Sequence, residues 1–227
     1  MADGFLTALA QDLGNGDLRG LSWLFSLFAF AVSMSATPGP NNAMVASSGA
    51  TFGLMRTLPH ILGVSFGFPI MLLAVALGAG ELLRAYPAAH AVMRWIGAAY
   101  LVWLAWRIAV SPIGRGEADA TVPRARAVAS GRPLNFIEAA LFQWINPKAW
   151  VIAIGAVATY TTGAAVLAQV LILSIVFLLV CIPCLTLWTG IGAGAARLLR
   201  TPRGLRAFNL AMAALLIASL VPLLGEG

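Results

Sequence analysis

Two short proline-containing stretches hold the residues of this sequence that are most suited to chemistry. The first, residues 37–42, is Thr-Pro-Gly-Pro-Asn-Asn, and the second, residues 146–148, is Asn-Pro-Lys. Each interrupts an otherwise apolar run near its middle. Because proline lacks a backbone N–H and clashes with the preceding turn, no straight helix passes through either stretch. Carbonyls freed at membrane depth find no water unless they line a cavity within the protein.

The two breaks together are suited to binding a zwitterion. Each proline opens a new helical segment, whose first N–H groups have no partner within the helix. Such positive helix ends attract a carboxylate, and the carbonyls freed before each break can accept from an ammonium group. The amide side chains nearby add donors and acceptors, although they could equally cap the half-helices or join spans. The predicted substrate-binding and translocation residues are Pro38, Gly39, Pro40, Asn41, Asn42, Gln143, Asn146, Pro147 and Lys148.

Lys148 leads the candidates for proton coupling, because a lysine at the centre of a span is costly and by default marks a functional site. It could bind a substrate carboxylate or exchange a proton, and the alternative is a side chain that snorkels along a tilted helix. His60 begins the second span and is of the residue type that titrates near neutral pH. Glu81 and Glu138 are further candidates, for which an ion pair with Arg84 and a helix N-terminus are the alternatives.

Composition indicates an integral membrane protein. Of the 227 residues, 60% are hydrophobic and 10% charged, whereas soluble domains carry about 25% charged residues. The mean hydropathy is +0.90. The net charge is +6, and most of the basic residues lie between apolar runs, as the positive-inside rule predicts. We therefore expect one transmembrane domain over residues 1–227, surrounded by the lipid bilayer, and no nucleic-acid partner.

Six stretches approach the ~20 apolar residues that a spanning helix needs. A polar segment at 1–20 precedes them, and its acidic residues argue against a cleaved signal peptide. The loop 111–135 is basic and short of large apolar residues, which indicates a solvated segment. The expected spans are 21–50 (long and broken), 61–83, 92–110, 136–158 (broken), 164–189 and 205–224.

The distribution of basic residues predicts the orientation. With six spans, ten of the 14 Lys and Arg residues fall on one side, three on the other, and Lys148 within a span. The side with ten is expected to face the cytoplasm. This orientation places the loop 111–135 in the cytoplasm and both termini outside.

The two halves of the sequence are faintly similar. Aligning Pro40 with Pro147 pairs two apolar runs, and the second and fifth spans each contain a proline, Pro69 and Pro183. Three spans per half is an odd number, so the halves must have opposite orientations. We expect an all-α membrane protein with six transmembrane helices in a 3+3 inverted repeat, with broken first and fourth spans and the site between the repeats.

Small residues four apart allow spans to approach closely, either within one chain or between the chains of a homodimer. Three such pairs occur in or near the spans, namely Gly49 with Gly53, Gly63 with Gly67, and Gly190 with Gly194. Cys181 and Cys184 flank Ile-Pro within an apolar run, which indicates packing at a kink rather than a redox motif. The sequence shows no metal cluster, phosphate loop or hydrolase motif. We therefore expect no metal, no cofactor and no enzyme.

At residues 37–42 and 146–150 the sequence resembles the LysE/RhtB family of amino-acid exporters. The resemblance extends over essentially the whole chain and includes residues 97–107. The run from Tyr100 to Arg107, followed by Ser-Pro, is similar to the branch that exports cysteine and O-acetylserine. The resemblance implies efflux of a small amino acid or derivative across a bacterial inner membrane, driven by the proton gradient. Many family members carry an acid where this chain has Asn41.

The expected function is a secondary active exporter, an antiporter that exchanges a small amino acid or derivative for protons by alternating access. The alternative is a passive channel or an accessory membrane subunit without coupled transport. Uphill efflux that collapses with a protonophore would exclude this alternative.

Overall fold

The structure, a computed structural model, describes residues 18–110, 132–199 and 201–221. Residues 1–17 and most of the expected loop 111–135 lie outside the described residues. The described segments consist of helices and short connections, without a strand. In chain order the elements are α2 (Leu18–Ala36), α3 (Pro40–Phe52), α4 (Leu54–Ala74), the π-helical η1 (Val75–Ala79), α5 (Gly80–Ala85), α6 (Pro87–Ala109), α8 (Phe136–Phe142), the 3₁₀ turn η2 (Gln143–Ile145), α9 (Pro147–Tyr160), the 3₁₀ turn η3 (Gly163–Ala165), α10 (Val166–Leu198) and α11 (Pro202–Ala218).

Two of these helices are long and apolar enough to cross a membrane by themselves. They are Leu54–Ala79, which joins α4 and η1, and α10. A third crossing results if α2 and α3, which bend by 55° at their break, form one span. Shorter apolar helices cover Trp95–Ala109 and Phe136–Ile145. The chain is therefore a helical membrane protein.

Two helices, α4 and α10, extend furthest beyond the expected spans. α4 begins at Leu54 rather than at residue 61, directly after Gly53, whose φ of +77° ends α3. The early proline of α4, Pro59, lies inside the helix instead of delaying its start. α10 continues through Pro183 to Leu198, past the expected end at residue 189. Most residues of this extension are Gly or Ala, and small side chains are common where helices pack inside membranes.

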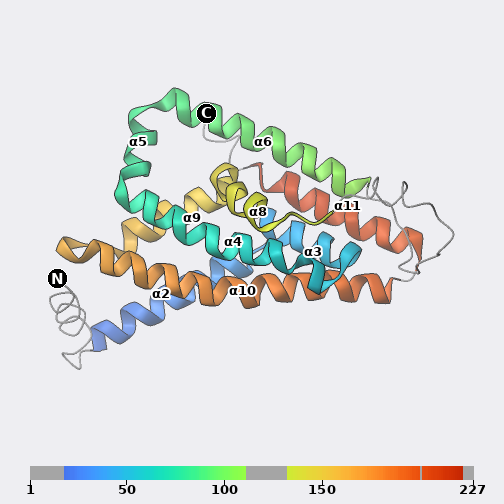
Figure 1. Cartoon of the computed structure of the whole chain (residues 1–227), viewed down its shortest axis with the longest axis horizontal. Coiled ribbons are helices and arrows are strands. Elements are labelled where there is room, and N and C mark those ends of the chain that lie inside the picture. The colour runs from blue at the N-terminus through green and yellow to red at the C-terminus, as the bar shows by residue number, and fades with distance from the viewer. Residues whose placement is uncertain (1–17, 111–131, 200, 222–227) are drawn as a thin grey trace.

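α10 runs along the lower side of the view in Figure 1 and packs against α2, α3 and α4. α2 and α3 pack along one part of it, and α4 packs along another. α8 packs on α4, while α6 and α11 lie side by side (Figure 1). The broken pair α2–α3 therefore packs on α10, and the short helix before the second break packs on α4.

The closest helix approach joins α3 to α10 through glycines. A Cβ atom on Gly49 would lie 2.2 Å from the Thr189 carbonyl oxygen, and one on Gly192 would lie 1.8 Å from the Ala46 carbonyl oxygen. Both distances are too short for any real side chain, so the two backbones are in direct contact. Such contacts matter in membranes, where association depends on close packing and not on exclusion of water.

A second close approach joins α4 to α8. A Cβ atom on Gly63 would lie 2.3 Å from the Phe136 carbonyl oxygen, and one on Gly67 would lie 2.7 Å from the Ala140 Cα atom. By contrast, Cβ atoms on Gly190 and Gly194 would meet nothing within 4 Å in the described part of the chain. The close contact on α10 is therefore made by Gly192, which lies between these two glycines on another face.

We expect Gly192→Ala to lower the free energy of unfolding by about 1–3 kcal/mol, because the added methyl group must separate α3 from α10. Gly190→Ala is the matched control, since it adds the same methyl to the same helix in open space. Both variants gain the same helix propensity, roughly 1 kcal/mol, so their difference isolates the steric effect. Thermal unfolding of the purified proteins in detergent measures it, and equal midpoints would contradict the packing described here.

Candidate functional site

The first break follows directly from its two prolines. Pro38 and Pro40 lack the N–H groups that would bond to the Met34 and Ala36 carbonyls in a continuous helix. α2 therefore ends at Ala36, and α3 begins at Pro40. Thr37 closes the end of α2, because its backbone N–H donates to the Ser33 carbonyl at 3.1 Å and its hydroxyl donates to the same oxygen.

Side chains from two helices bond to the carbonyls that this break frees. Asn42 Nδ2, on α3, donates to the Ser35 carbonyl at 2.9 Å and to the Thr37 carbonyl at 3.0 Å. Trp188 Nε1, on α10, donates to the Ala36 carbonyl at 3.2 Å. An unpaired carbonyl in an apolar setting is costly, so these bonds stabilise the broken conformation.

Lys148 reaches the same break from the start of α9. Its Nζ atom donates to the Thr37 carbonyl at 2.6 Å and lies 3.5 Å from the Pro38 carbonyl oxygen. Gly39 leaves room for the lysine stem, because a Cβ atom there would lie 2.7 Å from Lys148 Cδ. The carbonyls freed by the first break thus bind an ammonium group, and this ammonium group belongs to the second break.

The second break consists of a 3₁₀ turn and one extended residue between α8 and α9. Asn146 has extended backbone angles, and its side chain accepts from the Lys148 backbone N–H at 3.2 Å, so it caps α9. Gln143 is fully buried, and its Nε2 atom donates to the Ala139 carbonyl at 2.8 Å. Pro147 takes the first position of α9. The capping role that the sequence left open for the amides therefore applies to Asn146.

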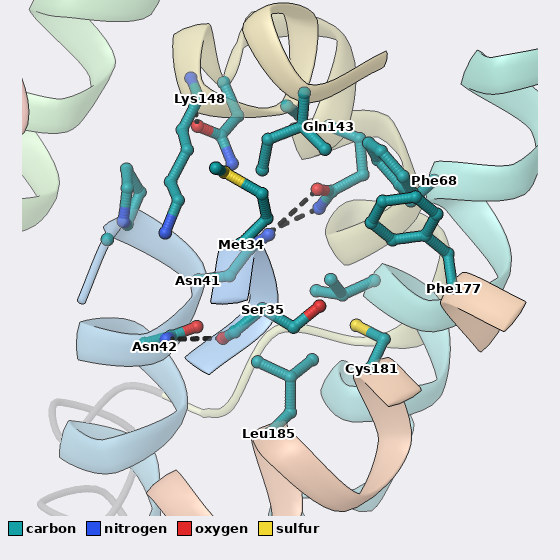
Figure 2. Close-up of a pocket in the computed structure, with 16 residues that line it drawn as sticks. Met34, Ser35, Asn41, Asn42, Phe68, Gln143, Lys148, Phe177, Cys181 and Leu185 are labelled. Atoms are coloured by element: carbon teal, nitrogen blue, oxygen red, sulfur yellow. Dashed lines mark hydrogen bonds between the residues drawn. The ribbon is translucent and has the colours of Figure 1, made fainter. Parts of the chain in front are cut away.

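The two breaks face each other across the middle of the molecule. Asn41 Nδ2 donates to Gln143 Oε1 at 2.9 Å, and Gln143 Nε2 donates to Asn41 Oδ1 at 3.3 Å (Figure 2). The bond from Lys148 to the Thr37 carbonyl joins them a second time. Segments more than 100 positions apart in the sequence are thus held together by side-chain hydrogen bonds.

A cavity opens where the breaks meet, with about 480 Å³ of empty space that is partly open to the exterior. Seven of the nine predicted binding residues line it, and the exceptions are Pro38 and Pro147. Its polar lining residues are Ser35, Asn41, Asn42, Gln143, Asn146 and Lys148.

The opposite part of the cavity is apolar and was not predicted from the sequence. Phe68 of α4 and Phe177 of α10 pack with ring centroids 4.9 Å apart, beside Cys181 and Leu185 (Figure 2). The available signal was the pair of mid-span prolines, since Pro69 follows Phe68 directly. That signal marks the depth of the cavity along the helices, but not which face of each helix lines it.

Of the four candidates for proton coupling, Lys148 lines the cavity and the other three do not. His60 lies on α4 and is 2% exposed. Glu81 lies in the first turn of α5 and is exposed. The side chain of its expected partner, Arg84, is not among those that the structure describes. The expected ion pair between Glu81 and Arg84 therefore stays a prediction.

Glu138 holds a structural position at the start of α8. Its carboxylate accepts from both terminal nitrogens of Arg132 and from the backbone N–H of Asn135 at 3.0 Å. The Asn135 side chain accepts in return from the Glu138 backbone N–H at 2.9 Å, which completes a capping box. The helix N-terminal role that the sequence offered for Glu138 is therefore present in the structure.

Comparison with known proteins identifies the family. The model of the LysE type translocator matches residues 32–225, which include both breaks and the helices around the cavity. The chain belongs to the LysE-type translocator family. This membership confirms the resemblance seen in the sequence and groups the chain with translocators rather than enzymes.

Curated relatives of this LysE-family chain include bacterial proteins named "Cysteine/O-acetylserine efflux protein". Those of Escherichia coli (strain K12), Shigella sonnei (strain Ss046) and Escherichia coli O157:H7 are each 31% identical over 137 residues, which cover 60% of this chain. The matched region spans 65% of the length of these relatives. No solved structure gives a significant match.

A double-mutant cycle tests whether the two breaks are joined as described. We expect Asn41→Ala and Gln143→Ala to be non-additive by about 0.5–3 kcal/mol in the free energy of unfolding, because either change removes the same pair of hydrogen bonds. Thr201→Ala is the control partner for Asn41→Ala, because Thr201 caps α11 by accepting from the Gly204 N–H. Unfolding in detergent measures the free energy of unfolding of the parent, of each single variant and of each double variant. Full additivity of the first pair would contradict the contact.

Proposed function

We propose that the chain is a secondary active exporter of small amino acids or close derivatives, coupled to protons and working by alternating access. One observation carries the proposal: two broken helices meet at a cavity that presents carbonyls, amides and an ammonium group at one end. Broken helices at membrane depth are a common means by which transporters hold small charged substrates. The names of the curated relatives, which specify cysteine and O-acetylserine efflux, indicate amino acids as the class to test.

The polar end of the cavity provides a binding mode for a zwitterion. Lys148 donates to the Thr37 carbonyl. An incoming α-ammonium group takes over this carbonyl, and the released Lys148 ammonium binds the substrate carboxylate. Because the exchange leaves neither the carbonyl nor the lysine unpaired, the substrate binds without creating a buried unsatisfied group. The apolar end, with Phe68 and Phe177, receives the substrate side chain.

The helix contacts support an inverted repeat for the alternating movement. The proposed six spans are α2–α3, α4, α6, α8–α9, α10 and α11. α2 and α3 pack on α10, the fifth span, and α8 packs on α4, the second span, so each broken span contacts the second helix of the other half. α4 also packs on α10, and α6 on α11, as equivalent pairs. A 3+3 inverted repeat has this exchange of partners, and its halves can rock about the site. We place it in a bacterial inner membrane, with the loop 111–135 in the cytoplasm and both termini outside.

Uptake into everted membrane vesicles tests the proposal, because export then becomes accumulation. We expect one or a few labelled amino acids, from a panel that includes cysteine and O-acetylserine, to accumulate above equilibrium. A protonophore should abolish the accumulation, since the proton gradient supplies the driving force. Equilibration without accumulation, unaffected by the protonophore, would instead identify a passive channel. Failure of the whole panel with the protein present in the membrane would overturn the assignment to amino acids.

Lys148 is the only lysine of the chain, and its removal tests the binding mode. We expect Lys148→Met to reduce accumulation by about 10- to 100-fold, the effect of losing a hydrogen bond to a charged group. Arg203→Ala, which removes an exposed cation outside the cavity, is the control. Quantified protein in the vesicles shows that both variants insert. Normal accumulation by the Lys148 variant would refute the role given to this side chain.

A further inference from the structure

His60 is buried without a hydrogen-bond partner. It is 2% exposed, and neither Nδ1 nor Nε2 has a partner within the described part of the chain. Among the side chains described there, the hydroxyl of Ser174 is the one other buried polar group in this condition. Burying an imidazole unpaired is costly. Such groups therefore call for an explanation, and a role in function is one of the common explanations.

The position of His60 links the cavity to the first turn of α8. Gly63, about one turn further along α4, packs its backbone on Phe136, so this face of α4 lies against α8. Val64, one turn after His60, lines the cavity. The imidazole therefore lies within one helical turn of both the cavity wall and the contact between α4 and α8.

Glu138 lies in the first turn of α8, the helix that packs on α4. Ala139, the next residue, packs on α4, since a Cβ atom on Gly63 would lie 2.8 Å from the Ala139 Cβ atom. The Glu138 side chain is 37% exposed, and that of its partner Arg132 is 64% exposed. A carboxylate that is open to solvent, on the helix that packs against this part of α4, is suited to passing protons toward the buried imidazole.

The remaining elements packed on α4 offer no second partner of this kind. α3 contains no titratable residue. Glu138 is the one titratable residue of α8. The other titratable or charged side chains on α4 and the helices against it are Arg56 on α4, Lys148 and Tyr160 on α9, and Cys181, Cys184 and Arg197 on α10.

We propose that His60 is the proton-binding residue of the transport cycle and that Glu138 is its connection to solvent. The inference rests on the proposed function and assigns its coupling site. Glu138 guides a hydronium ion from solvent toward His60. The unprotonated nitrogen of the neutral imidazole accepts the proton, and a water molecule remains. The resulting imidazolium competes with Arg132 for the Glu138 carboxylate. α8 continues into η2, where the Gln143 side chain is hydrogen-bonded to Asn41. A movement of α8 along α4 would therefore also move these two cavity residues.

Two transport assays on the purified full chain in liposomes separate coupling from binding. The first measures exchange of labelled for unlabelled substrate at equal pH on both sides, which needs no net proton movement. The second measures accumulation driven by an imposed pH gradient. We expect His60→Gln to retain exchange and to lose gradient-driven accumulation by roughly tenfold or more, the size of a typical coupling free energy.

Two matched controls accompany this variant. Ser174→Ala removes the other buried unpaired polar group, on α10, and His90→Gln removes the only other histidine of the chain. We expect both to retain exchange and accumulation. Gradient-driven accumulation by His60→Gln equal to that of the parent would overturn the inference and leave the proposed function standing. A parent that neither exchanges nor accumulates any amino acid would instead overturn the proposed function, and the inference with it.

A spectroscopic measurement decides the case in which His60→Gln loses both activities. In the His90→Gln protein, purified without a histidine tag, ¹⁵N-labelled histidine gives signals from His60 alone. Since coupling is reciprocal, a substrate coupled to protonation of His60 must shift the pH at which its signals titrate. We expect such a shift with saturating substrate. The same titration with and without substrate, or no titration at all, would overturn the inference.

Discussion

The structure depends on the need to pair the carbonyls that a broken helix frees inside a membrane. In water, solvent would satisfy the end of α2, but in a bilayer each unpaired group is costly. Asn42, Trp188 and Lys148 supply the missing donors from three different helices. The bonds that make the break tolerable therefore also hold α9 and α10 against it. Stability of the fold and construction of the site are thus one requirement, met by the same side chains.

Glycines make this arrangement geometrically possible. An indole or an ammonium group reaches a backbone carbonyl only if the helices that carry them lie close together. Gly49 and Gly192 bring α3 onto α10, and Gly63 and Gly67 bring α8 onto α4. Each break is thus fixed by a backbone-to-backbone contact with a long neighbouring helix. In lipid, exclusion of water does not drive helices together. Glycine, which has no Cβ atom, lets the backbones pack closely enough for van der Waals contact to hold them.

The sequence was sufficient to place both breaks and most polar residues of the cavity, because these follow from local covalent chemistry. Proline removes a donor wherever it occurs, and the lysine and amides beside it are visible in the one-dimensional pattern. The partners across helices could not be predicted in this way. Trp188, Phe68 and Phe177 enter the site because of how α4 and α10 are rotated, and the same rotation selects Gly192 instead of Gly190 and Gly194. Rotation depends on packing of the whole bundle, which a single sequence does not display.

For the proposed proton-coupled exporter, the charges of the cavity favour separate places for the substrate and the proton. The residues that line it include one lysine and one cysteine but no carboxylate and no histidine. Lys148 is held by carbonyl dipoles. In the proposed binding mode a zwitterion displaces it and brings no net charge, so the charge of the cavity does not change. In such a cycle the coupling proton binds either at a residue outside the cavity or at Lys148. Deprotonation of Lys148 would remove the positive charge that the proposed binding of the substrate carboxylate requires. The proposed role of His60 avoids this conflict, because His60 lies outside the cavity lining and its protonation leaves the charge of Lys148 unchanged.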